Sequence, residues 1–255
     1  IDSGIDYMHP DFQNADGSTR ILALWDQTIA PNPSKSFLSP PGYALGTLFT
    51  EEQINAAIAA PTLQERVAFC PSFDSSGHGT HVTGIAAGNG RVQIANRGVA
   101  YEASLLIIKL GSPEPMGFPS TTQLMQAVDF SVRFAIERQL PLSINLSFGN
   151  TYGSHSGTSL LETYLDSVSN LGRICIVTGS GNEGNNSGQV GGRLLSNTSK
   201  SLEFVVGDYE RNLSIQIWKN YWDEIRLQLL PPFSQAPIQI PDIPGSWRFA
   251  VGDTE

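Results

Sequence analysis

In the middle of the chain, short apolar runs alternate with longer amphipathic segments, and this order constrains the fold more than any other feature. The runs Leu105–Leu110, Leu142–Phe148 and Ile174–Thr178 have the length and composition of strands buried on both faces. Residues 121–139 and 159–171, which separate them, carry apolar side chains at helical spacing. The alternation predicts an α/β fold with a mostly parallel sheet flanked by helices. In such sheets, functional sites gather at the carboxyl ends of the strands.

Two regions depart from this alternation. Residues 31–71 form an excursion rich in Pro, Gly and Ser, in which Thr50 and Gln53 predict a capped helix that ends at Pro61. From about residue 191 the pattern becomes strand-like, and antiparallel strands are expected at Leu202–Val206, Leu213–Trp218 and Ile225–Leu230. We therefore expect two domains, 1–190 and 191–255, the second being an incomplete antiparallel β-domain of the sandwich or jelly-roll kind.

Composition excludes several classes of protein. The 255 residues have a net charge of −9 and no Lys/Arg cluster, which argues against a nucleic acid or an anionic membrane as partner. No apolar run approaches the roughly 20 residues of a membrane-spanning helix. The two cysteines, Cys70 and Cys175, are too few for a disulfide scaffold and are expected to be free thiols.

Three motifs carry residue types suited to chemistry. Asp2, followed by Ser and Gly, is expected at a strand end, where a carboxylate can orient an imidazole. His78, in the run GHGTHVTG, is expected at a helix N-terminus, where the macrodipole opposes its protonation. Asn182, in GSGNEG after a buried strand, can donate its amide to an oxyanion. Each motif taken alone is also compatible with a purely structural turn or cap.

A metal site is the main rival for the histidines. His78 and His81 have the i,i+3 spacing of a pair of metal ligands. No HExxH arrangement or neighbouring Cys/His cluster supplies further ligands, so we favour a general base at His78 over a metal. No metal is therefore assigned.

Taken together, the three motifs resemble those of the subtilisin-like serine proteases over residues 1–30 and 74–190. The resemblance implies that Asp2 is the orienting acid, His78 the base and Asn182 the oxyanion donor, with no cofactor. Calcium, which many such proteases bind, is not supported, because the run NGRVQIANRG after Gly88 does not match the usual loop. The substrate-binding residues implied by the resemblance are Ser147, Phe148, Gly149, Ser180 and Gly181.

The nucleophilic serine of that family, which lies in a G-T-S-x-A-x-P segment and begins a buried helix, is not found. Ser159 follows Gly157 and Thr158, but it precedes Asn182 in the chain and forms a capping box with Glu162. We therefore expect a fragment of a serine endopeptidase, the N-terminal part of its catalytic domain, that is inactive alone. The alternative is a pseudoprotease that binds a partner or regulates germination without cutting.

The long excursion and the β-rich tail are most similar to the clostridial spore-germination (Csp) subtilases, which carry a jelly-roll insertion. That resemblance implies a protein or peptide substrate, namely the pro-form of a spore cortex-lytic enzyme, and a propeptide as a second partner. It also implies an extracytoplasmic or spore-associated location. A carbohydrate-binding tail is a weaker alternative, and it predicts aromatic side chains such as Trp218 and Trp222 on one exposed sheet face.

Overall fold

The computed structural model separates into two compact units, which are residues 1–151 with 156–200 and residues 152–155 with 201–255. None of the helices in the part of the chain that it describes is long and apolar enough to cross a membrane. The described residues are 1–111, 119–147, 149, 152–182, 184–185, 188–209, 213–232 and 236–248.

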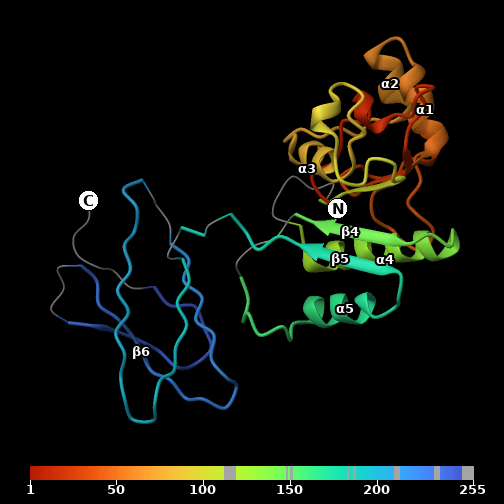
Figure 1. Ribbon diagram of the computed structural model, residues 1–255. Coiled ribbons are helices and arrows are strands. Elements are labelled where there is room, and N and C mark those ends of the chain that lie inside the picture. The colour runs from red at the N-terminus through yellow and green to blue at the C-terminus, as the bar shows by residue number, and fades with distance from the viewer. Residues whose placement is uncertain are drawn as a thin grey trace. The chain divides into compact units, whose positions relative to one another are not determined.

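The first unit contains strands and helices, which alternate along the chain from residue 105 to residue 178 (Figure 1). Its strands are β1 (Ile21–Asp26), β2 (Thr47–Thr50), β3 (Leu105–Lys109), β4 (Leu142–Leu146) and β5 (Ile174–Thr178). Its α-helices are α1 (Glu51–Ala59), α2 (Leu63–Phe69), α3 (His78–Ala87), α4 (Thr121–Glu137) and α5 (Leu160–Ser169). Short 3₁₀ turns lie at Pro10–Phe12, Pro33–Lys35 and Ile94–Asn96.

The first two residues of the chain join two groups of strands. In one group β1 lies between β2, which is antiparallel to it, and β3, which is parallel; in the other, β4 and β5 are parallel. The Asp2 N–H donates to the Ile108 carbonyl at 3.0 Å, and the Leu110 N–H donates to the Asp2 carbonyl at 2.9 Å. On the other side, the Ile1 amino group donates to the Asn145 carbonyl at 3.2 Å. Asp2 therefore lies between β3 and β4, near their carboxyl ends.

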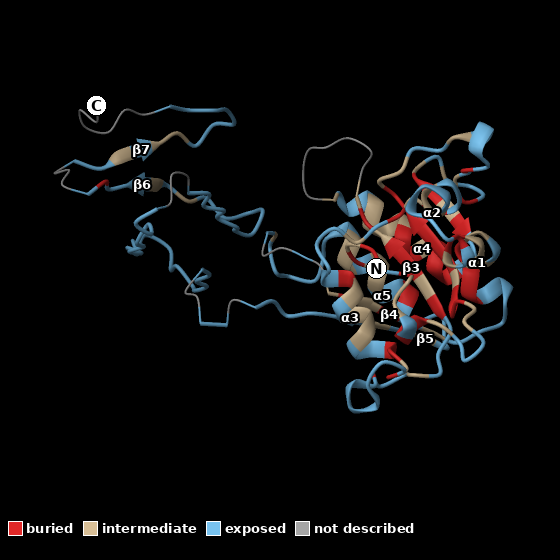
Figure 2. Cartoon of the chain, turned by 90° about the horizontal axis from the view of Figure 1, so that it is seen from above, coloured by how far each residue is buried: buried red, intermediate tan, exposed pale blue. Residues whose placement is uncertain are grey.

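Helices cover the sheet because its strands present large apolar side chains. Trp25 of β1 is fully buried and packs edge-on against Phe130 of α4, with ring centroids 5.2 Å apart. Val128 and Val132 of α4 pack with Ile144 of β4 in a neighbouring cluster. Figure 1 shows α4 and α5 running beside β4 and β5, and Figure 2 shows the buried residues gathered in the first unit.

The elements predicted between residues 105 and 178 are confirmed. Strands and helices lie at all five expected places, and α1 begins at the predicted capping box of Thr50 and Gln53. The excursion at 31–71 is more regular than predicted. It contains a second helix, α2, which begins at the capping box of Thr62 and Glu65, and the strand β2, which extends the sheet.

The prediction that β5 is buried on both faces is wrong. In the described structure Cys175 and Val177 are exposed, and Val177 retains 50% of its accessible surface. The reason is that α5 packs on one face of β5, while Cys175 and Val177 point to the other. Both cysteines are free, as predicted, and only Cys70 is buried.

Within its described residues, the second unit contains two short antiparallel strands, β6 (Leu227–Leu229) and β7 (Ile238–Ile240). The strand β6 lies inside the predicted segment 225–230, but the strands predicted at 202–206 and 213–218 are wrong. Their alternating pattern finds no sheet to pair with, and Val205 keeps 91% of its surface exposed. The jelly-roll character of this unit and the boundary between residues 190 and 191 stay predictions.

Candidate active site

The structure brings Asp2 and His78, 76 residues apart in sequence, into direct contact. Asp2 Oδ1 lies 2.7 Å from Nδ1 of His78. The carboxylate is buried, with 8% of the Asp2 surface exposed, whereas the His78 side chain is 52% exposed. Oδ1 also accepts the Ser3 N–H at 2.7 Å, and among the described residues Oδ2 has no hydrogen-bond partner. One ring nitrogen of His78 is thus fixed by a buried carboxylate, while the ring remains accessible.

The two glycines beside His78 place it at the first position of α3. Gly77 precedes the helix with a φ of 74°, a left-handed conformation that favours glycine. Gly79 is buried against residues 2–4, where an added Cβ would clash with the Gly4 carbonyl oxygen and lie 3.2 Å from Cβ of Asp2. The absence of a side chain at residue 79 therefore lets the first turn of α3 approach Asp2.

The charge of Asp2 determines the direction of the shift in the His78 pKa. The hydrogen bond that the His78 ring donates to Asp2, and then the negative charge of Asp2, raise the pKa of His78 above its usual 6.5. This net direction is opposite to the one expected from the helix N-terminus, because a carboxylate in hydrogen-bond contact outweighs a partial charge. The arrangement favours proton acceptance by the imidazole.

Residues that the sequence analysis did not select support this pair. Asp74, four residues before His78, accepts hydrogen bonds from the Ser3 hydroxyl at 2.8 Å and from the Thr80 N–H at 2.8 Å. The available signal was a carboxylate just before a helix start, a position that often caps the first turn.

The remaining predicted site residues follow the ends of β4 and β5. Ser147 comes directly after β4 and accepts a hydrogen bond from the Asn145 amide at 2.9 Å. Ser180, Gly181 and Asn182 follow β5, which Gly179 extends by donating to the Leu146 carbonyl at 3.2 Å. The two segments emerge at the carboxyl edge that also holds Asp2. Gly149 is described and exposed, and Phe148 lies outside the described residues.

Ser159 is the N-cap of α5, as predicted. Its hydroxyl accepts the Glu162 N–H at 3.3 Å, and its own N–H donates to the Glu162 carboxylate at 2.8 Å. This capping box gives Ser159 a structural role that requires no catalytic function.

The donors around the loop after Gly88 do not fit a calcium ion. The Arg91 guanidinium donates to the Asn14 carbonyl at 2.7 Å, and the Val92 N–H donates to Oδ1 of Asp11 at 2.8 Å. Calcium binds carbonyl and carboxylate oxygens, but these two oxygens already accept hydrogen bonds from protein groups, one of which is the cationic side chain of Arg91. Within the described ranges, no group of three or more His, Cys, Asp or Glu side chains is placed to hold a metal.

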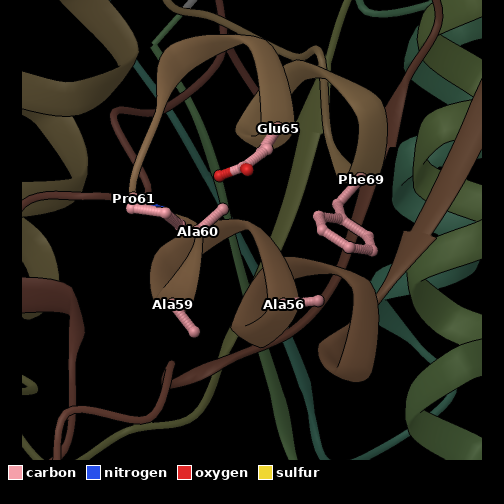
Figure 3. Close-up of a pocket in the computed structure, with 6 residues that line it drawn as sticks. All are labelled: Ala56, Ala59, Ala60, Pro61, Glu65 and Phe69. Carbon is pink, nitrogen blue, oxygen red and sulfur yellow. The ribbon is translucent and has the colours of Figure 1, made fainter.

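A surface pocket between α1 and α2 lacks catalytic chemistry (Figure 3). It measures about 410 Å³ and is lined by Ala56, Ala59, Ala60, Pro61, Glu65 and Phe69. Its single carboxylate, Glu65, belongs to the capping box of α2. The candidate site is therefore the carboxyl edge of the sheet around Asp2 and His78.

An acid–imidazole pair on the carboxyl edge of a mostly parallel sheet is typical of hydrolases of the subtilisin class. Comparison with known families agrees, since the model of the subtilase family matches residues 1–221. The chain belongs to the subtilase family. Subtilases need no organic cofactor.

Individual relatives are consistent with this assignment. The chain is 32% identical over 109 residues to the subtilisin-like protease SBT2.4 of Arabidopsis thaliana, covering 40% of this chain and 12% of the relative. It is 26% identical over 191 residues to the minor extracellular protease Vpr of Bacillus subtilis, covering 75% of this chain and 18% of Vpr. It matches the solved structure of the Clostridium perfringens CspB protease with a TM-score of 0.61 and 34% identity, over 72% of this chain and 36% of CspB. The chain thus spans less than a fifth of the length of SBT2.4 and of Vpr.

Proposed function

We propose that these 255 residues carry the orienting acid, the general base and the oxyanion donor of a subtilisin-type serine endopeptidase. The observation that carries the proposal is the 2.7 Å contact between Asp2 Oδ1 and Nδ1 of His78. In this role Asp2 holds the proton on Nδ1, so that Nε2 accepts the proton of a serine hydroxyl as that hydroxyl attacks a peptide carbonyl. Protonated His78 is then stabilised by the same carboxylate, and it returns the proton to the leaving amine.

The residues beyond β4 and β5 complete the proposal. Asn182 donates its amide N–H to the oxyanion of the tetrahedral intermediate. In subtilisin, the enzyme from which the value comes, removing such a donor lowers kcat by about 10²- to 10³-fold. The segment 147–149 binds the extended substrate backbone on one side, and Ser180 and Gly181 line the other. The support is their shared position at the carboxyl edge of the sheet that holds Asp2.

We place the nucleophilic serine outside these 255 residues, because no serine in them has the expected motif and Ser159 serves as a helix cap. The chain alone is then inactive as a peptidase. This proposal favours a protease over a pseudoprotease, since a protein that only binds has no need for an imidazole hydrogen-bonded to a buried carboxylate.

The substrate in this proposal is a protein, cut by limited proteolysis. The resemblance to the Csp group, with which the similarity to the CspB protease agrees, implies the pro-form of a spore cortex-lytic enzyme as the substrate and the enzyme's own propeptide as a second partner. It also supports an extracytoplasmic or spore-associated location, in keeping with the extracellular relative Vpr. The carbohydrate-binding alternative is not favoured, because Trp218 and Trp222 are exposed but lie outside β6 and β7.

The test uses the product of the whole gene with a fluorogenic protein substrate and a serine-directed fluorophosphonate probe. We expect turnover and labelling, with His78→Ala lowering kcat/KM by roughly 10³ or more. His81→Ala, a change to the exposed histidine of the same helix, is the matched control and is expected to retain turnover. Turnover that survives His78→Ala, or the absence of labelling, would refute the proposal. Turnover by the 255 residues alone would place the nucleophile within them.

A further inference from the structure

The Asp74 carboxylate is a centre of hydrogen bonding between two segments of the candidate site. Oδ2 accepts both the N–H and the hydroxyl of Thr80, at 2.8 and 2.6 Å. Oδ1 accepts the Ser3 hydroxyl at 2.8 Å, the Gly77 N–H at 3.1 Å and the Ser76 hydroxyl at 3.2 Å. Four of these five donor groups come from Ser76, Gly77 and Thr80 at the start of α3, and the fifth comes from Ser3, beside Asp2. One carboxylate therefore binds both segments that must meet in the site.

Ser3 transmits this connection directly to Asp2. Its backbone N–H donates to Asp2 Oδ1 at 2.7 Å, while its hydroxyl donates to Asp74. The same hydroxyl accepts the Gly79 N–H at 2.9 Å, from the residue next to His78. Ser3 thus contacts the orienting acid, the Asp74 carboxylate and the first turn of the helix at once.

We propose that Asp74, acting through Ser3 and Thr80, is a positioning residue that holds Asp2 and His78 at hydrogen-bond distance. It contacts neither the imidazole nor a reacting atom, so its effect is on geometry and on the local field. The inference rests on the proposed function for its catalytic meaning, but its test needs no turnover.

The protonation state of Asp74 supports the proposal. Burial alone raises the pKa of Asp74, but the hydrogen bonds from Thr80, Ser3 and Gly77 outweigh burial and hold it at about 2. Asp74 is therefore charged at neutral pH. Its charge adds to that of Asp2 in raising the pKa of His78. Lys109, a nearby cation, makes its contacts with other groups. Its Nζ donates to the Phe73 carbonyl at 2.6 Å and lies 3.6 Å from Oδ2 of Asp26.

The neighbouring residue Ser72 offers a matched control. Its hydroxyl donates to Oδ2 of Asp26 at 2.6 Å, and both side chains are buried. Ser72→Ala removes a buried hydrogen bond from the segment that carries Asp74 without changing the contacts among Ser3, Asp74 and Thr80. This variant therefore shows whether a loss of stability in this segment alone changes the midpoint of the His78 titration.

The experiment is an NMR titration of the His78 ring in the 255-residue chain, with a thermal melt of each variant. The resonance is assigned by its absence in His78→Gln. Asp74→Asn keeps the shape of residue 74 and removes its charge, and Ser3→Ala breaks the bridge while leaving the charge. We expect both variants to lower the midpoint of the His78 titration. Ser72→Ala is expected to lower the melting temperature and leave the midpoint where it is.

The outcomes separate positioning from general stability. If Asp74→Asn does not fold, the Ser3→Ala midpoint decides. A midpoint equal to that of the unmodified chain in the Asp74 and Ser3 variants overturns the proposal, as does an equal fall in Ser72→Ala. A lowered midpoint in these variants, together with no peptidase activity in the product of the whole gene, supports the positioning role and refutes the proposed function. Peptidase activity in the product of the whole gene, with an unmoved midpoint in the variants, refutes the positioning role and supports the proposed function.

Discussion

Substituting Gly79 by alanine tests whether the close approach of α3 to residues 2–4 fixes the Asp2–His78 geometry. The added Cβ would clash with the Gly4 carbonyl oxygen, and it would also lie 3.0 Å from the Gly4 nitrogen and 3.2 Å from Cβ of Asp2. Two of these three contacts are with backbone atoms, which cannot rotate away. The start of α3 must therefore move away from residues 2–4. Gly84 provides the control in the same helix, because a Cβ there meets nothing within 4 Å.

The size of the effect follows from these contacts. Restoring an ordinary van der Waals separation of about 3.5 Å requires a displacement on the order of 1 Å. Added to the 2.7 Å between Asp2 Oδ1 and Nδ1 of His78, that displacement breaks the hydrogen bond. Overpacking of this kind costs about 1–3 kcal/mol. At Gly84, by contrast, alanine is expected to stabilise the helix by about 0.5–1 kcal/mol through helix propensity.

Urea unfolding of the two variants, followed by circular dichroism, measures the two free energies, and NMR follows the His78 titration. We expect opposite signs of stability change from the same substitution at two positions of one helix. We also expect a lowered His78 midpoint only in Gly79→Ala. In the product of the whole gene, Gly79→Ala is expected to lower kcat on the order of 10²-fold. Equal stability changes, or an unmoved His78 midpoint in Gly79→Ala, would refute the reasoning.

Two further predictions concern titration and thiol reactivity. Because Asp2 raises the pKa of His78, protonated His78 adds stability below pH 6.5 and loses it as the pH rises through the higher folded value. Asp2→Asn should abolish this component of the pH dependence of the melting temperature, and a melting curve series that is unchanged in the variant would contradict the assignment. Burial raises the pKa of the Cys70 thiol to about 12, so a thiol reagent should label the exposed Cys175 alone in the folded chain. Both cysteines should react after unfolding, and rapid labelling of Cys70 in the folded chain would show that its segment opens.

The alternation of strands and helices was predictable from the sequence because it depends on local patterns. Helix starts follow from capping residues such as Thr50 and Ser159, whose side chains bond to N–H groups three residues away. The buried strands follow from continuous apolar runs. The same logic failed for residues 202–206, since alternation specifies a strand only where a partner and a buried face exist. It also missed the capping box of Thr62, a local signal that was present.

The sequence by itself determined which chemical groups the candidate site contains, because Asp2, His78 and Asn182 each lie in a short motif with a recognisable order. Only the tertiary structure decided how they are held. The insertion of Asp2 between β3 and β4, and its contact with a histidine 76 residues away, depend on long-range packing that no local pattern encodes. The same is true of Asp74, because a carboxylate before a helix predicts a cap, whereas its bond to Ser3 exists only once residues 2–4 and the helix have packed together.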